Sequence, residues 1–218
     1  MRKIKAVIFD LDQTLINSIE RFYAVFIDTL KHFGGSTIGW DVFIESYAKD
    51  TLNSFIPRGI EAKEFWDYFL SHYDECEVKS RVIEGAEDTL RFLKQRGVYV
   101  IVVTGRKTPP RKVKEELEEL GLGRMVDEVY TAEELDDIAV DFSKKPLLVK
   151  AMKKFKINPD ECVFVGDYKP DMRVGKELGV YTIGVLTGHE TRCSLKKAGA
   201  DIVIDSIKDL PELLKNFL

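Results

Sequence analysis

Cysteine and histidine are scarce in this sequence, and their scarcity excludes several classes of protein. The three cysteines, Cys76, Cys162 and Cys193, are far apart and form no CxxC pair, so we expect neither a disulfide scaffold nor a dithiol redox motif. The three histidines show no metal-ligand spacing with these cysteines, which argues against a zinc site. This cysteine usage is typical of a reducing compartment, and we expect a cytoplasmic protein.

A basic surplus and long apolar runs are also lacking. The net charge is −4, whereas a general nucleic-acid binder needs a basic surface, so nucleic acid is not an expected partner. Each apolar run is shorter than the roughly 20 residues that cross a bilayer, and a first strand starting by residue 4 leaves no room for a signal peptide. The 218 residues are 44% apolar, enough for a sizeable core. We expect a soluble protein, monomeric or homodimeric, without a membrane partner.

The second half of the chain alternates between strand and helix patterns. Apolar runs predict strands at residues 6–9, 98–103, 126–130, 162–165, 180–185 and 202–204. Helical spacing with proline and glycine boundaries predicts helices at residues 85–96, 109–120, 146–155, 171–178 and 210–217. Strands joined by helix-length connections predict an α/β fold, a doubly wound parallel sheet of the Rossmann-like kind.

One segment breaks this alternation with helical patterns alone. Apolar residues follow helical spacing between Ile19 and Leu30, and again between Phe65 and Tyr73. We therefore predict a core domain of residues 1–16 and 80–218, and a small all-helical cap of residues 17–79 inserted after the first strand. Because 13 of the 23 aromatic residues fall between residues 16 and 80, they are expected mainly to build the core of this small bundle.

Two aspartates, Asp10 and Asp12, follow the first predicted strand. Side chains at positions i and i+2 of an extended chain point to the same side, about 6–7 Å apart. Two carboxylates directed at one point repel each other unless a cation, a proton or a reaction compensates them. Taken alone, the pair is also compatible with an ordinary polar turn between a strand and a helix.

Other polar residues also lie at the carboxyl ends of predicted strands. Thr104 and Gly105 end the second strand, Asp167 ends a later one, and Asp171 lies four residues further on. Lys145 stands at the start of the preceding helix. In an open parallel sheet these ends form one crevice, so we expect these residues to meet the aspartate pair there.

These four constellations, in this order, resemble the motifs of the haloacid dehalogenase (HAD) superfamily. They are the segments starting at Asp10, Thr104, Lys145 and Gly166, and the helical insertion resembles the C1 cap of that family. The residues from Gly184 to His189 and from Ala200 to Asp205 are most similar to its phosphoglycolate-phosphatase-like branch. One departure is Gln13, where the family usually has glycine; we expect that this turn does not need a positive φ.

The resemblance implies a Mg²⁺ cofactor and a nucleophile. Asp10, Asp167 and the main-chain carbonyl of Asp12 would hold the ion, and Asp10 would attack phosphorus to give an aspartyl-phosphate. Asp12 would protonate the leaving alcohol and then activate water.

The resemblance also implies residues that bind the phosphate. Thr104 and the Gly105 amide would bind the non-bridging oxygens, and Lys145, rather than its neighbour Lys144, would supply a fixed positive charge. Asp171 would orient that lysine or a water on the metal, although an acid at this place also suits a helix N-terminus. Arg58, Arg106 and His189 stay open as additional site residues.

The sequence thus predicts a Mg²⁺-dependent phosphatase that acts on a small phosphomonoester, such as a phosphoglycolate-like acid or a sugar phosphate. A phosphomutase of the β-phosphoglucomutase type has the same aspartate pair and is the nearest alternative. Haloacid dehalogenation is disfavoured, since a halide leaving group needs no acid and Asp12 supplies one. A binding protein that has kept the fold is the alternative outside enzymes.

Overall fold

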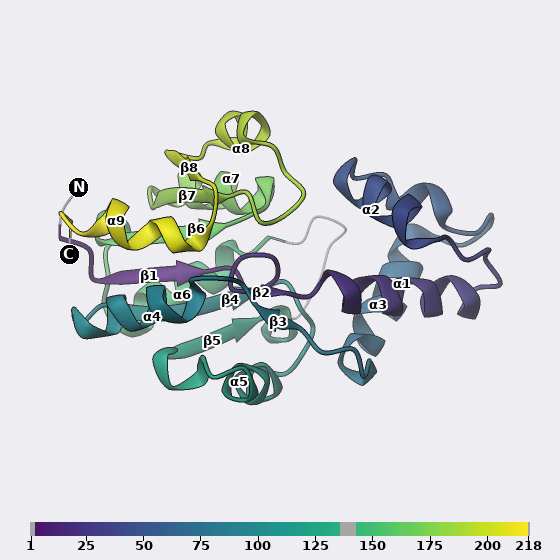
Figure 1. The fold of residues 1–218 in the computed structure, drawn as a ribbon, viewed down its shortest axis with the longest axis horizontal. Coiled ribbons are helices and arrows are strands. Elements are labelled where there is room, and N and C mark those ends of the chain that lie inside the picture. The colour runs from purple at the N-terminus through teal and green to yellow at the C-terminus, as the bar shows by residue number, and fades with distance from the viewer. Residues whose placement is uncertain (1–2, 136–142, 218) are drawn as a thin grey trace. The chain divides into compact units, whose positions relative to one another are not determined.

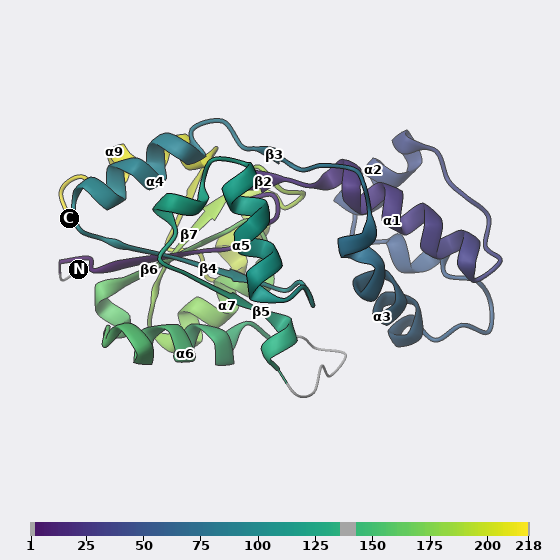
Figure 2. The same ribbon diagram turned by 90° about the horizontal axis from the view of Figure 1, so that it is seen from below.

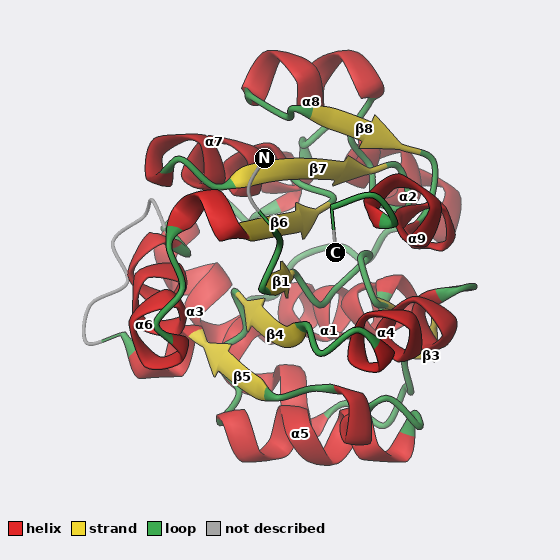
Figure 3. Cartoon of the chain, turned by 90° about the vertical axis from the view of Figure 1, so that its left-hand side faces the viewer, coloured by secondary structure: helices red, strands yellow, loops and turns green. Residues whose placement is uncertain are grey.

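The computed structural model describes residues 3–135 and 143–217 of the chain. Its main feature is a six-stranded sheet in the order β5-β4-β1-β6-β7-β8, with neighbouring strands parallel (Figures 1 and 3). The strands are β1 (Ala6–Phe9), β4 (Tyr99–Thr104), β5 (Glu128–Thr131), β6 (Cys162–Gly166), β7 (Tyr181–Val185) and β8 (Ile202–Ile204). The predicted α/β fold class is confirmed.

Helices cover both faces of this sheet (Figure 2). Val7 and Phe9 of β1 pack in one apolar cluster with α4 (Ala86–Gln95), α5 (Pro110–Glu119) and α9 (Leu210–Leu214). Ala6 and Ile8 pack in the opposite cluster with α6 (Lys145–Phe155) and α7 (Lys169–Leu178). Successive strand residues point to opposite faces, so a strand buried on both sides must be apolar throughout, as β1 is.

The chain order places the end of β1 where open α/β sheets bind ligands. The strand pairs with β4 on one side and β6 on the other, and the sequence visits β4 and β5 before it returns to β6. The direction of winding therefore reverses beside β1. At such a reversal the connecting loops diverge, and they leave a crevice outside the carboxyl ends of the strands.

Residues Ser18–Ser80 form a second compact unit, separate from the unit of Met1–Asn17 and Arg81–Leu218. This helical unit contains α1 (Ile19–His32), α2 (Trp40–Ala48) and α3 (Ala62–His72). Phe26, Phe43 and Phe65 are fully buried at its centre. Large aromatic side chains give a unit of this size an apolar core that aliphatic residues alone would not fill.

The two connections to the helical unit pair with each other. β2 (Ile16–Asn17) and β3 (Arg81–Val82) form an antiparallel two-stranded sheet, which belongs to the same unit as the large sheet. The helical unit begins and ends one residue later than the range 17–79 expected from the sequence.

Most differences from the predicted elements concern their ends. A helix not predicted from the sequence, α8 (Arg192–Ala198), begins at a capping box formed by Thr191 and Ser194. The last helix ends at Leu214, earlier than predicted. Among the described residues, no helix is both long and apolar enough to span a membrane.

Candidate active site

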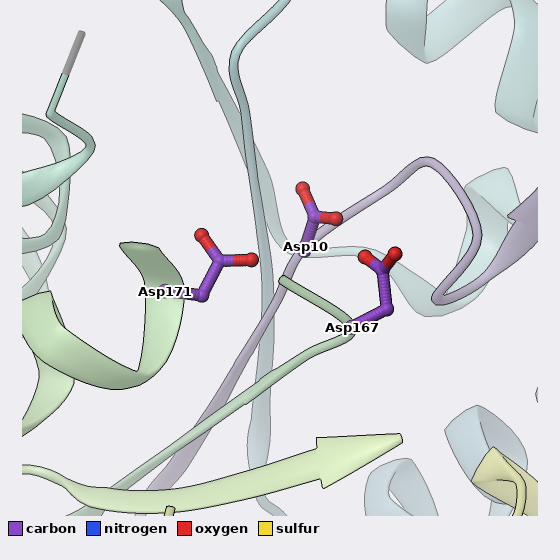
Figure 4. Close-up of side chains that lie close together, drawn as sticks. All are labelled: Asp10, Asp167 and Asp171. Atoms are coloured by element: carbon purple, nitrogen blue, oxygen red, sulfur yellow. The ribbon is translucent and has the colours of Figure 1, made fainter. Parts of the chain in front are cut away.

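Three buried aspartates meet at the carboxyl end of the sheet (Figure 4). Asp10 directly follows β1, Asp167 directly follows β6, and Asp171 lies in the first turn of α7. One carboxylate oxygen of each lies within 4.8 Å of the others. The aspartates come together because β1 and β6 are parallel neighbours in register, with Phe9 opposite Val165.

The electrostatics of this group suit a bound cation. Burial, and then the charges of Asp10 and Asp171, raise the pKa of Asp167 well above its usual range. Burial raises the pKa of Asp171 to about 6, against the opposing charge of Lys144. Within residues 3–135 and 143–217, the Oδ2 atom of Asp171 has no hydrogen-bond partner. A hard divalent cation with oxygen ligands would neutralise these charges, so the donor set fits Mg²⁺.

Lys144 is the cation that the structure brings to this group. Its Nζ lies 2.5 Å from Oδ1 of Asp10 and 2.8 Å from Oδ1 of Asp171. Burial by itself would lower the pKa of this ammonium, but the charges of Asp10 and Asp171 outweigh burial and raise it. Lys144 therefore carries a fixed positive charge against the Asp10 carboxylate.

The expectation that Lys145 takes this place was wrong. Lys145 is the first residue of α6. Its Nζ lies 3.1 Å from Oε2 of Glu177, a residue of α7, and both side chains are exposed. Adjacent residues at a helix start point in different directions, so only one of the two lysines can reach Asp10. The sequence prediction began this helix at Pro146, one residue too late, whereas the helix begins at Lys145 and Lys144 is its N-cap.

The turn after β1 adds a residue that had no predicted role, Thr14. Its Oγ1 donates to Oδ1 of Asp167 at 3.3 Å and, with a longer contact of 3.5 Å, to Oδ2 of Asp10. The turn is closed by three amides, those of Thr14, Leu15 and Ile16, that donate to the Leu11 carbonyl. Thr14 thus links the first and last motifs directly.

Gln13 adopts a left-handed conformation with φ of 58°, so the expectation that this turn does not need a positive φ was wrong. Its amide donates to the Ile16 carbonyl at 2.7 Å, and its carbonyl accepts from Oγ1 of Thr187 at 2.5 Å. These two bonds compensate a conformation that costs a non-glycine residue about 1–2 kcal/mol. They also explain how glutamine replaces the usual glycine.

Asp12 lies apart from the three-aspartate group and is paired with Arg106. The guanidinium of Arg106 donates to both carboxylate oxygens, from Nε at 2.8 Å and from Nη2 at 2.5 Å. Thr104 is buried at the end of β4, where its Oγ1 accepts the Arg106 amide at 3.2 Å. Thr104 and Gly105 therefore occupy the predicted strand end, and their contact with a phosphate stays a prediction.

The remaining open candidates lie outside the three-aspartate group. The His189 ring packs 5.4 Å from the Tyr168 ring, and its Nε2 is 3.8 Å from a Glu190 oxygen. Arg58 is an exposed residue of the helical unit. In contrast, Gly188 approaches the site closely, because a Cβ atom added to it would lie 1.8 Å from Oδ2 of Asp167. The loop after β7 therefore packs directly on this carboxylate.

Comparisons with known proteins agree with the fold and with the family resemblance. The sequence model of the haloacid dehalogenase-like hydrolases matches residues 7–185. The chain is 27% identical to phosphoglycolate phosphatase 1 of Pseudomonas aeruginosa, over 94% of this chain and 78% of that protein. It is 28% identical to pyrophosphatase PpaX of Bacillus mycoides, over 97% of each chain.

A solved structure shows the same fold over nearly the whole chain. The crystal structure of a predicted phosphatase from Clostridium acetobutylicum superposes with a TM-score of 0.80 and 22% identity, over 99% of this chain and 100% of that one. The family match spans most of the chain, including the first and last of the four motifs. The resemblance seen in those motifs is confirmed, and the chain belongs to the haloacid dehalogenase-like hydrolase family.

Proposed function

We propose that this enzyme is a Mg²⁺-dependent phosphatase that hydrolyses a small phosphomonoester through a phosphorylated Asp10. One observation carries the proposal. The Asp10 carboxylate lies at the end of the central strand, in contact with the Lys144 ammonium and grouped with the carboxylates of Asp167 and Asp171. A carboxylate nucleophile needs this compensation because a phosphate monoester is itself a dianion.

Three residues of the chain would hold the metal ion. They are Asp10 and Asp167 through their carboxylates and Asp12 through its main-chain carbonyl, while Asp171 positions Lys144 from the other side. Bound there, Mg²⁺ would supply positive charge that offsets the repulsion between the Asp10 carboxylate and the phosphate.

In this proposal the reaction has two steps. A carboxylate oxygen of Asp10 forms a bond to phosphorus as the bond to the ester oxygen breaks, and Asp12 gives its proton to the departing alkoxide. Asp12, now ionised, takes a proton from water as the water attacks phosphorus and releases Asp10. Thr104 and the Gly105 amide would hold the non-bridging oxygens, with Lys144 as the fixed positive charge.

Small phosphorylated acids and sugar phosphates are the substrates we propose. The relatives include a phosphoglycolate phosphatase and a pyrophosphatase, so phosphoglycolate and inorganic pyrophosphate are both informative candidates. Transfer of the phosphoryl group from Asp10 to a second sugar hydroxyl instead of water would make the protein a phosphomutase. We also propose that the enzyme acts in the cytoplasm, as a monomer or a homodimer.

The test is phosphate release from a panel containing p-nitrophenyl phosphate, phosphoglycolate, sugar phosphates and pyrophosphate, with Mg²⁺ or with EDTA. We expect release from at least one compound with Mg²⁺ and none with EDTA. Isomerisation of a sugar phosphate, when a bisphosphate primer is added and no phosphate is released, would point to the mutase. Stabilisation by Mg²⁺ without turnover of any compound would contradict the enzyme and favour a binding protein.

Gly188→Ala should weaken Mg²⁺ binding by about 10–100-fold, the usual cost of disturbing residues that support a metal ligand. The added methyl group would collide with the Asp167 carboxylate and turn it away from Asp10. The dissociation constant follows from the melting temperature measured against Mg²⁺ concentration.

Gly39→Ala is the matched control for this variant, because nothing lies within 4 Å of a Cβ atom added there. Both variants should melt near the wild type without metal. Unchanged Mg²⁺ affinity in Gly188→Ala would argue against Asp167 as a ligand.

A further inference from the structure

Arg106 is a buried arginine that the chemistry described above leaves without a role. Its side chain is 5% exposed, and its guanidinium lies between two carboxylates. Nε and Nη2 donate to the two oxygens of Asp12, and Nη1 donates to Oε2 of Glu116 at 2.5 Å. The guanidinium is withdrawn from water, whereas the Asp12 and Glu116 side chains are 29% and 16% exposed. Removing a charged group from water costs free energy, and apolar residues of the same volume often give equal stability. The arrangement therefore calls for an explanation beyond stability.

The position of Arg106 is fixed from several directions. Its amide donates to Thr104 Oγ1, and its carbonyl accepts the Ala132 amide at 2.8 Å, which ties its main chain to the ends of β4 and β5. Glu116 holds the guanidinium from α5. Because both ends of the arginine are held, the guanidinium presents a rigid pair of donors to Asp12.

Such a pair of donors fixes a carboxylate in one plane, which a single donor does not. The plane matters for an acid that must deliver its proton along one direction. Each carboxylate oxygen has two lone pairs, so an oxygen that accepts a hydrogen bond from an arginine can still carry a proton. Asp12 can therefore keep its orientation while it gives and takes a proton.

We propose that Arg106, held by Glu116, is the positioning residue that orients the Asp12 carboxyl toward the leaving group. This inference rests on the proposed phosphatase activity and adds a dependence on substrate. An alkyl phosphate expels a strongly basic alkoxide and needs the proton from Asp12 in the first step. The p-nitrophenolate ion is a good leaving group and needs it far less. Loss of orientation must therefore affect alkyl esters selectively.

The test compares Arg106→Lys with the wild type in kcat/KM for an alkyl phosphate and for p-nitrophenyl phosphate. The value of kcat/KM reports the first irreversible step, which is the attack by Asp10. We expect the preference for the alkyl ester to fall about 10–100-fold, a part of what general acid catalysis contributes. Lysine keeps the positive charge but cannot contact both oxygens in a plane. An equal loss on both esters would mean a merely structural arginine and would overturn the proposal.

Arg111→Lys is the matched control. Arg111 is 83% exposed and pairs with Glu115 one turn along the same helix that carries Glu116. The Arg111→Lys variant should leave kcat/KM for both esters, and the ratio of the two values, unchanged. Glu116→Gln should lower the ratio in the same direction as Arg106→Lys but by less, and it serves as the second variant if Arg106→Lys folds poorly. An unchanged ratio in Glu116→Gln and Arg106→Lys would overturn the inference.

A double variant separates an action through Asp12 from an independent one. In Asp12→Asn the acid is gone, so adding Arg106→Lys should cause no further selective loss on the alkyl ester. Additive losses would show that Arg106 acts on the substrate itself and would contradict the positioning role. A wild type inactive on every ester would refute the proposed phosphatase and this inference together. An active wild type with an unchanged ratio in the variants refutes this inference alone.

Discussion

Lys144→Met should lower kcat/KM for phosphate-ester hydrolysis by about 10³-fold, whereas Lys145→Met should leave it within about twofold. The Lys144 ammonium is buried against Asp10 and Asp171, and its charge is fixed because those carboxylates raise its pKa. The Lys145 ammonium pairs with Glu177 at the surface. Steady-state kinetics of the two variants, measured on the same ester, provide the comparison.

The stability of the two variants supplies the control. Removing Lys144 leaves Asp10 and Asp171 buried without their cation, which costs about 3–5 kcal/mol when the charges stay uncompensated. Uptake of a proton reduces this cost, since burial already raises the pKa of Asp171 to about 6. Melting curves with and without Mg²⁺ show whether the variant is folded in the assay. A folded Lys144→Met enzyme with wild-type activity would contradict the proposed role.

Strand direction explains why Asp10 and Asp167 lie together, whereas Asp12 of the predicted pair lies apart from them. Residues that directly follow parallel neighbours must lie at one edge of the sheet, and this rule places Asp10 beside Asp167 without any knowledge of side-chain conformation. The apolar runs of β1 and β6 were equally informative, since a strand covered on both faces has no polar positions to obscure it.

The sequence could not predict in which direction side chains point at the ends of helices and strands. Lys144 and Lys145 are identical neighbours, and a helix start shifted by one residue decides which of them reaches Asp10. The positive φ of Gln13 depends on a hydrogen bond from Thr187, far away in the chain. The pairing of Arg106 with Asp12 likewise joins two loops whose approach depends on how β4 and β1 end. Spacing within a motif does not encode such contacts between distant loops.

Asp10→Asn should reduce phosphate release by about 10⁴-fold or more, because it removes the nucleophile while it keeps the shape of the side chain. Asp167→Asn makes the same substitution in the same buried group but should leave the nucleophile intact. Its activity should therefore recover in part as Mg²⁺ is raised, whereas that of Asp10→Asn should not. The measurement is the initial rate of phosphate release across a Mg²⁺ titration for both variants. Asp88→Asn, which changes an exposed carboxylate on α4, should behave as the wild type does.

The two responses distinguish a nucleophile from a ligand. A ligand that binds weakly can be offset by mass action, since more of the ion fills the site. An amide nitrogen or oxygen cannot replace a carboxylate oxygen that must form a bond to phosphorus, so no concentration of Mg²⁺ restores that step. Recovery of Asp10→Asn by Mg²⁺ would mean that water attacks the phosphate directly and that Asp10 only holds the ion. The charge of Lys144 would then serve the phosphate rather than the nucleophile.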